Sequence, residues 1–150
     1  MNDAWTMEEL IPHSGAMVLV DEVLEHTDDT VVTRYTPRRG GLFNREDDSV
    51  PAWLGIEYMA QAIATFAGLE ARKAGRDIRL GFLLGTRHYH SHTPRFSPDQ
   101  PLTVRAQRSI EDSNGLSVFN CSIHGPDLLA EASINVFQPP DVESFLRENA

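Results

Sequence analysis

Residues 50–68, VPAWLGIEYMAQAIATFAG, form the longest apolar run of the sequence and contain a single acid, Glu57. Pro51 suits the first turn of a helix, and Ala, Leu, Ile and Met continue to about Ala74, where Gly75 is the expected C-terminal stop. Because the segment is apolar nearly all round, it predicts a buried helix rather than an amphipathic surface helix. A glutamate is rarely buried unless another group pairs with it or uses it. Glu57 is therefore the first candidate functional residue.

The segments before this helix predict a short helix, a hairpin and a loop. Thr6 and Glu9 have capping-box spacing, which predicts a short helix from about Met7. Residues 17–25 (MVLVDEVLE) and 30–36 (TVVTRYT) are rich in Val, Leu and Thr and flank a turn at positions 28 and 29, so they predict two paired strands. Residues 37–49 hold two Gly, one Pro and six charges, which is typical of an exposed loop.

After the long helix the sequence predicts only strands. They are expected over residues 80–84, 86–92, 102–110, 116–124 and 128–137, with turns at 112–115 (DSNG) and 125–127 (GPD). One sheet cannot cover every face of an apolar helix. A sheet that curls around the helix, with a second copy completing the cover, is the economical solution. We therefore expect an α+β fold and a dimer.

Length, charge and cysteine content narrow the class of protein. The chain has 150 residues, the size of one domain, and we expect a single domain over residues 1–150. The net charge of −9 and pI of about 5.0 argue against nucleic-acid binding. The acidic N-terminus lacks the pattern of a signal peptide, and polar residues interrupt the apolar run, so we expect no membrane span and a cytoplasmic location. The single Cys121 excludes an internal disulfide framework and a Cys-rich zinc site.

Three segments resemble the β-hydroxyacyl-acyl-carrier-protein dehydratases of the FabA and FabZ types, which are hotdog-fold proteins. IPHSGAMVLVDEV (11–23) is similar to the FabZ-type LPHRxPxLLVDRV segment, and VPAWLGIEYMAQA (50–62) to the PGVLxxExxAQ and PGCLGLDAMxQ segments. GFLLGTRHYHSHTPRFSPDQPL (81–102) looks like the strand, proline and PGDxL turn that follow. VPAWLGIE together with the GFLLG strand looks closest to the ApeP-like dehydratases of aryl-polyene clusters. The resemblance implies a hotdog fold, a curled antiparallel sheet wrapped around one long buried helix.

The resemblance also implies a reaction, the removal of water from a 3-hydroxyacyl thioester to give the 2-enoyl thioester. The substrate is carried on the phosphopantetheine of acyl carrier protein, in fatty-acid or polyene-type biosynthesis, and no protein-bound cofactor or metal is implied. The chemistry needs a base for the C2 proton and an acid for the departing C3 hydroxyl. It also needs donors on the thioester oxygen, which the free N–H groups of a helix N-terminus supply. The active sites are expected at the subunit interface.

Several residues of the helix match the expected chemistry. Glu57 stands at the acid position of the family, and Ala52 replaces the glycine that supplies one backbone donor. Trp53 follows Ala52 at the helix start and is expected to contribute to oxyanion or substrate binding. Gln61 lies one turn beyond Glu57 on the same helix face and is expected beside the substrate. The structural alternative for Glu57 is a hydrogen bond to the backbone or to Gln61.

The base is the open part of the prediction. The family carries a histidine fourteen residues before its acid, where this sequence has Phe43. His13, in IPHSG, is a candidate base or pocket residue, or else a structural histidine of the N-terminal turn. His88 is a candidate pocket residue. In a strand it shares one face with residues 90 and 92, both His, a spacing that a metal could use, although a solvated strand face is the main alternative and no metal is expected.

The missing histidine leaves three functions open. The chain acts as a dehydratase on its own, or it is a non-catalytic or half-catalytic acyl-binding subunit whose sister hotdog dehydratase supplies the histidine. In the third case it is a hotdog acyl thioesterase in which Glu57 activates water. The sequence does not separate a homodimer from a heterodimer.

Overall fold

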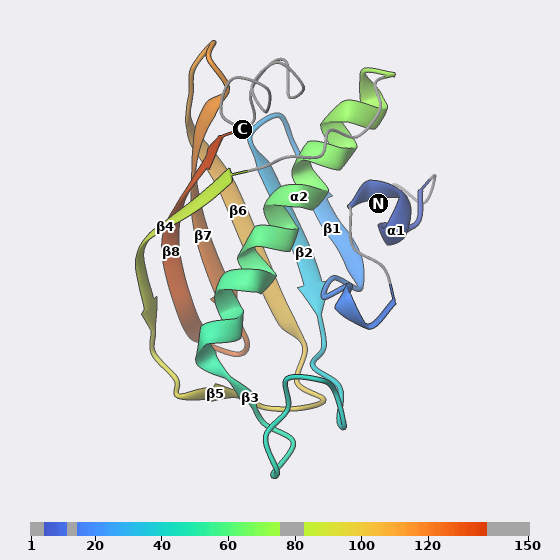
Figure 1. The fold of residues 1–150 in the computed structure, drawn as a ribbon, viewed down its shortest axis with the longest axis vertical. Helices are drawn as coiled ribbons and strands as arrows, with labels where there is room; N and C mark the ends of the chain where they lie inside the picture. Colours follow the sequence, from blue (N-terminus) through green and yellow to red (C-terminus); the bar gives the residue numbers. More distant parts are fainter. Residues whose placement is uncertain (1–4, 12–14, 76–82, 138–150) are drawn as a thin grey trace, which may run out of the picture.

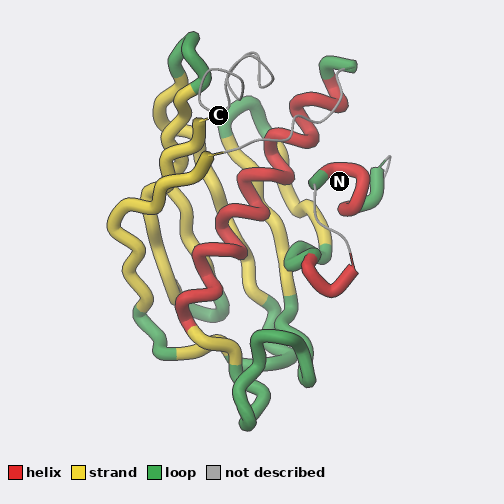
Figure 2. Tube along the Cα trace, in the orientation of Figure 1, coloured by secondary structure: helices red, strands yellow, loops and turns green. Residues whose placement is uncertain are grey.

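A curled antiparallel sheet wraps one long helix in the computed structural model, which describes residues 5–11, 15–75 and 83–137 (Figure 1). The six strands lie in the order β1-β2-β6-β7-β8-β4, and the long helix α2 (Gly55–Lys73) runs across the concave face of the sheet (Figure 2). The strands are β1 (Glu22–His26), β2 (Thr30–Tyr35), β4 (Leu83–Ser91), β6 (Leu102–Glu111), β7 (Leu116–His124) and β8 (Leu128–Phe137). This arrangement confirms the predicted hotdog fold.

Helix α2 is the centre of the core, as its composition predicts. Twelve of its residues are buried, among them Met59, Ile63 and Leu69, which pack against the inward side chains of the sheet. The helix ends where predicted, because Gly75 adopts a φ of +68° that most other residues disfavour.

The start of α2 differs from the prediction. Pro51 belongs to the two-residue strand β3 (Val50–Pro51), which pairs with β5 (Arg95–Phe96). Residues Ala52–Leu54 form a 3₁₀ turn, η2, and regular helix begins at Gly55. The short strand pair holds the chain extended up to Pro51, so the predicted first turn becomes a tighter one.

The predicted strands are largely confirmed. Strands β7 and β8 match the predicted ranges to the residue, and β2 and β6 end within one residue of them. The two strands predicted at 80–84 and 86–92 are one strand, β4, within the described residues, and positions 80–82 lie outside them.

The strand predicted over residues 17–25 is wrong in its first half. Gly15–Met17 form a 3₁₀ turn, η1, and β1 begins only at Glu22. The Leu19 N–H donates to the Gln61 side chain at 2.7 Å, so this apolar segment docks on α2 instead of pairing in the sheet.

The short helix α1 (Met7–Leu10) has the predicted capping box between Thr6 and Glu9. It packs against α2 at Gly68, where an added Cβ would lie 2.0 Å from the Leu10 carbonyl oxygen. Glycine at this position therefore permits the close approach of the two helices. Within the described ranges, no helix has the length and apolar character that a membrane span requires.

Candidate functional site

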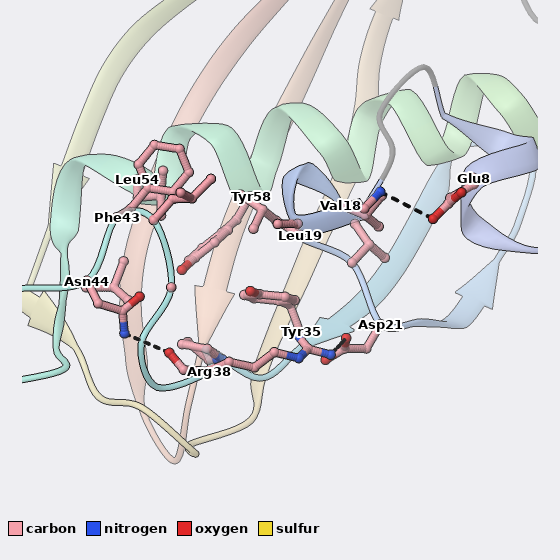
Figure 3. Close-up of a pocket in the computed structure, with 17 residues that line it drawn as sticks. Glu8, Val18, Leu19, Asp21, Tyr35, Arg38, Phe43, Asn44, Leu54 and Tyr58 are labelled. Atoms are coloured by element: carbon pink, nitrogen blue, oxygen red, sulfur yellow. Dashed lines mark hydrogen bonds and ion pairs between the residues drawn. The ribbon is translucent and has the colours of Figure 1, made fainter.

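A cavity of about 420 Å³ lies beside the start of α2 (Figure 3). The walls come from Glu8 of α1, the segment that docks on α2, the end of β2 with the loop after it, and the residues around the start of α2. The apolar and aromatic lining includes Val18, Leu19, Tyr35, Phe43, Val50, Leu54 and Tyr58, and the polar lining includes Glu8, Asp21, Arg38 and Asn44. Its volume falls in the range of small-molecule sites in proteins.

Gln61 joins the helix to the segment that forms one wall of this cavity. Its side chain is fully buried, accepts from the Leu19 N–H at 2.7 Å and donates to the Met17 carbonyl at 2.8 Å. The same amide nitrogen donates to Glu57 Oε1 at 3.1 Å. This is the hydrogen bond that the structural alternative for Glu57 named, and it orients the carboxylate.

Glu57 lies in the first turn of α2 and is half-buried. It is not part of the cavity lining, but Leu54 and Tyr58 are, and they stand on either side of it along the helix. The carboxylate lies in the first turn of α2, near the positive end of the helix dipole.

The backbone at the helix start is held by β4 and by the bend that follows it. The Ala52 N–H donates to the Pro94 carbonyl at 3.3 Å, so the N–H predicted to face a thioester oxygen has a protein acceptor. The Ala52 carbonyl accepts from the Tyr89 hydroxyl at 2.5 Å and from the Gly55 N–H. An added Cβ at Gly55 would lie 2.3 Å from the Tyr89 oxygen, so glycine is needed for the tyrosine to reach Ala52.

Trp53 and Phe43 form an aromatic pair at the edge of the site. Trp53 is 59 % exposed and does not line the cavity, and its ring meets that of Phe43 edge-on at 6.3 Å. Phe43, at the position where the family has its histidine, lines the cavity. This side chain offers no group that could take a proton.

Of the two candidate histidines, the structure describes only His88. His13 lies outside the described residues. His88 is exposed on β4 at a bulge, with a φ of +57°, and does not line the cavity. Among the described residues no three His, Cys, Asp or Glu side chains come together as metal ligands.

The sequence analysis missed two tyrosines that face each other across the cavity wall. The rings of Tyr35 and Tyr58 are 5.3 Å apart, and both hydroxyls point toward the space next to Asn44 and Arg38 (Figure 3). Burial raises the pKa of Tyr58 well above its ordinary value, and the neighbouring tyrosines add to this shift. The hydroxyl therefore stays protonated and can donate. The sequence did hold one signal for Tyr58, which is a tyrosine in a mostly apolar helix.

Arg38 closes the polar side of the cavity. Its guanidinium donates to Asp21 at 2.5 Å and lies over the Tyr35 ring. The hydrogen bond to Asp21 raises the pKa of Arg38, with a smaller contribution from Tyr35. The cation is thus already paired with a carboxylate.

A family model, described as ApeP-like with the name ApeP dehydratase, matches residues 5–147. The chain belongs to the ApeP-like dehydratase family. The family assignment supports hydro-lyase activity at a general level. No curated protein matches the chain.

Solved structures agree with the ApeP-like assignment. A chain of the dehydratase heterocomplex ApeI:P from Xenorhabdus doucetiae superposes with a TM-score of 0.85 and 26 % identity, over 96 % of this chain and 97 % of that one. AziG from S. sahachiroi has a TM-score of 0.58 and 11 % identity, over 79 % of this chain and 90 % of that one. The E. coli PaaI protein from the phenylacetic acid degradation operon has a TM-score of 0.54 and 11 % identity, over 78 % and 82 %. The last two show likeness of fold alone.

Proposed function

We propose that this ApeP-like chain takes part in the dehydration of 3-hydroxyacyl thioesters carried on acyl carrier protein, with Glu57 as the proton donor. The observation that carries the proposal is the position of Glu57. Its carboxylate accepts from Gln61 in the first turn of α2, and its chain neighbours Leu54 and Tyr58 line a cavity of ligand size. The reaction class rests on the family match over residues 5–147.

The proposed step breaks two bonds and forms one double bond. A base removes a proton from C2, and charge develops on the thioester oxygen, which needs hydrogen-bond donors. The Ala52 N–H would have to leave the Pro94 carbonyl to act as one of them. The bond between C3 and the hydroxyl oxygen then breaks, and Glu57 gives its proton to that oxygen, so that water leaves. The C2–C3 double bond of the enoyl thioester results, and Glu57 regains a proton from the solvent.

The base has to come from a residue other than Phe43. This favours a second form of the proposal, in which the chain is one subunit of a heterodimer and a sister hotdog subunit supplies the histidine. The similar ApeI:P structure, at 26 % identity, is itself a dehydratase heterocomplex. The cytoplasmic location, the polyene-type or fatty-acid pathway and the role of His13 stay predictions from the sequence.

The test measures turnover of 3-hydroxyacyl-carrier-protein by mass, with the chain alone and with its sister subunit added. We expect Glu57→Gln to reduce turnover at least about 100-fold, the lower end of general acid–base contributions. Glu70→Gln is the matched control, because Glu70 lies in a remote turn of the same helix and bonds His26; the turnover of this variant should change less than about twofold. Wild-type turnover by the Glu57 variant would contradict the proposal.

Two further results separate the alternatives. Activity that appears only when the sister subunit is added supports the heterodimer, and full activity of the isolated chain excludes it. Release of free acid from acyl thioesters that lack a 3-hydroxyl would identify a thioesterase instead.

A further inference from the structure

The Tyr58 hydroxyl points into the cavity from a side chain that is 1 % exposed. Its ring is fixed between Tyr35, at 5.3 Å, and Phe96, at 5.6 Å, so the hydroxyl cannot swing out to bulk water. Among the described residues no hydrogen bond to this hydroxyl is found, and the raised pKa arises from burial and charge effects without a hydrogen bond. Without a ligand, water in the cavity can accept from the hydroxyl, whereas a ligand that displaces this water and offers no acceptor leaves the hydroxyl unpaired, at a cost of about 1–3 kcal/mol. The site therefore favours a ligand that supplies the acceptor.

The charges around the cavity indicate what kind of acceptor fits. Arg38 is bound to Asp21 at 2.5 Å, and Glu8 is a second carboxylate in the lining. Among the lining residues that the structure describes, no cation is free to neutralise an anion, and the carboxylates of Asp21 and Glu8 disfavour a negatively charged ligand. A neutral oxygen is favoured over a carboxylate or phosphate.

The remaining walls determine the rest of the ligand. Val18, Leu19, Val50 and Leu54 offer aliphatic surface, and Phe43 adds an aromatic face. Such walls gain free energy by covering apolar groups, at about 25 cal/mol per Å² removed from water. The cavity therefore fits a group that is apolar along most of its surface and carries one neutral oxygen near its inner end.

We infer that this cavity selects acyl groups that carry a neutral oxygen acceptor, such as a carbonyl, within their apolar part, and that the Tyr58 hydroxyl donates the hydrogen bond that recognises it. A saturated hydrocarbon chain of the same shape leaves the hydroxyl without a partner. The inference rests on the proposed function in naming an acyl group as the ligand. Its test measures binding without turnover, so the two can fail separately.

The test compares two small probes of nearly the same shape, cyclohexanone and methylenecyclohexane, which differ in a carbonyl oxygen against a methylene group. Their dissociation constants are measured by NMR titration of the full chain. The ratio of the two constants is then compared between the wild type and Tyr58→Phe, which keeps the ring and removes the donor. Taking the ratio cancels the difference in hydrophobicity between the probes, as in a double-mutant cycle.

We expect the preference for the ketone to fall by roughly 2- to 12-fold in Tyr58→Phe, the equivalent of one net hydrogen bond. Tyr89→Phe is the matched control, because that hydroxyl is also internal but bonds Ala52 and does not line the cavity. Its ratio should equal that of the wild type. An unchanged ratio in Tyr58→Phe, an equal fall in both variants, or no binding of either probe to the wild type would overturn the inference.

Discussion

Replacing Gln61 by leucine removes three hydrogen bonds, two of which tie the cavity wall to α2. The side chain is fully buried and bonds the Leu19 N–H, the Met17 carbonyl and the Glu57 carboxylate. Leucine fills a similar volume but cannot replace any of the three.

The expected loss of stability depends on which of the three groups that Gln61 bonds can be reached by water after the substitution. Leu19 is 5 % exposed, so its stranded N–H costs about 1–3 kcal/mol. Met17 is 42 % exposed and Glu57 is half-buried, so water replaces much of those two bonds. Their residual cost is of the order of the apolar gain from leucine, about 1 kcal/mol. We expect Gln61→Leu to lower the free energy of unfolding by about 1–3 kcal/mol and the Tm by roughly 3–10 °C.

The assay is urea and thermal unfolding followed by circular dichroism. The matched control is Gln107→Leu, the same chemical change on the exposed face of β6, which should alter stability by less than about 0.5 kcal/mol. A Gln61 variant as stable as the wild type, or an equal loss in both variants, would refute the reasoning.

Two other substitutions test the packing and the pH dependence. Gly68→Ala places a Cβ 2.0 Å from the Leu10 carbonyl oxygen, so we expect urea unfolding to show a net loss of about 1–2 kcal/mol despite the better helix propensity of alanine. Gly85→Ala is the control, because its Cβ meets nothing closer than 4.0 Å, and it should leave the free energy of unfolding nearly unchanged. An equal loss of stability in both variants would show that the close contact at Gly68 is not the cause. Burial, and then Lys73, lower the pKa of His26 in the folded state, so the unfolded chain binds its proton more readily and stability falls as the pH drops below the unfolded pKa of about 6.5. Unfolding measured from pH 7.5 to 5 should show a shallower loss for His26→Phe, and parallel curves for variant and wild type would rule this out.

The features of the fold that the sequence predicted correctly are those with strong local causes. Apolar residues on all sides of α2 require that this helix be buried. The DSNG turn at 112–115 correctly predicts that β7 begins at Leu116. The segment 17–21 misled the prediction, because its Val and Leu content is typical of a strand. It docks on α2 through Gln61, a contact 42 positions away in the chain that local pattern does not contain.

The candidate site could be predicted only in part for the same reason. The sequence predicts the helix, and the helix places Glu57 near its start. The hydrogen bond between Gln61 and Glu57 follows from their spacing of four residues along a helix. The acceptor of the Ala52 N–H comes from Pro94, and the cavity around Tyr58 forms where several distant segments meet. Neither arrangement is visible until the chain is folded.

The most direct test of the central claim is a crystal structure of the chain with its sister subunit and a non-reactive 3-hydroxyacyl thioester analogue. The measured quantity is the distance from the Glu57 carboxylate to the C3 hydroxyl oxygen. The proposed role predicts a hydrogen bond of about 2.6–3.2 Å, or the same contact through one water. A bound analogue whose C3 hydroxyl lies beyond the reach of a water-bridged contact with Glu57 would contradict it.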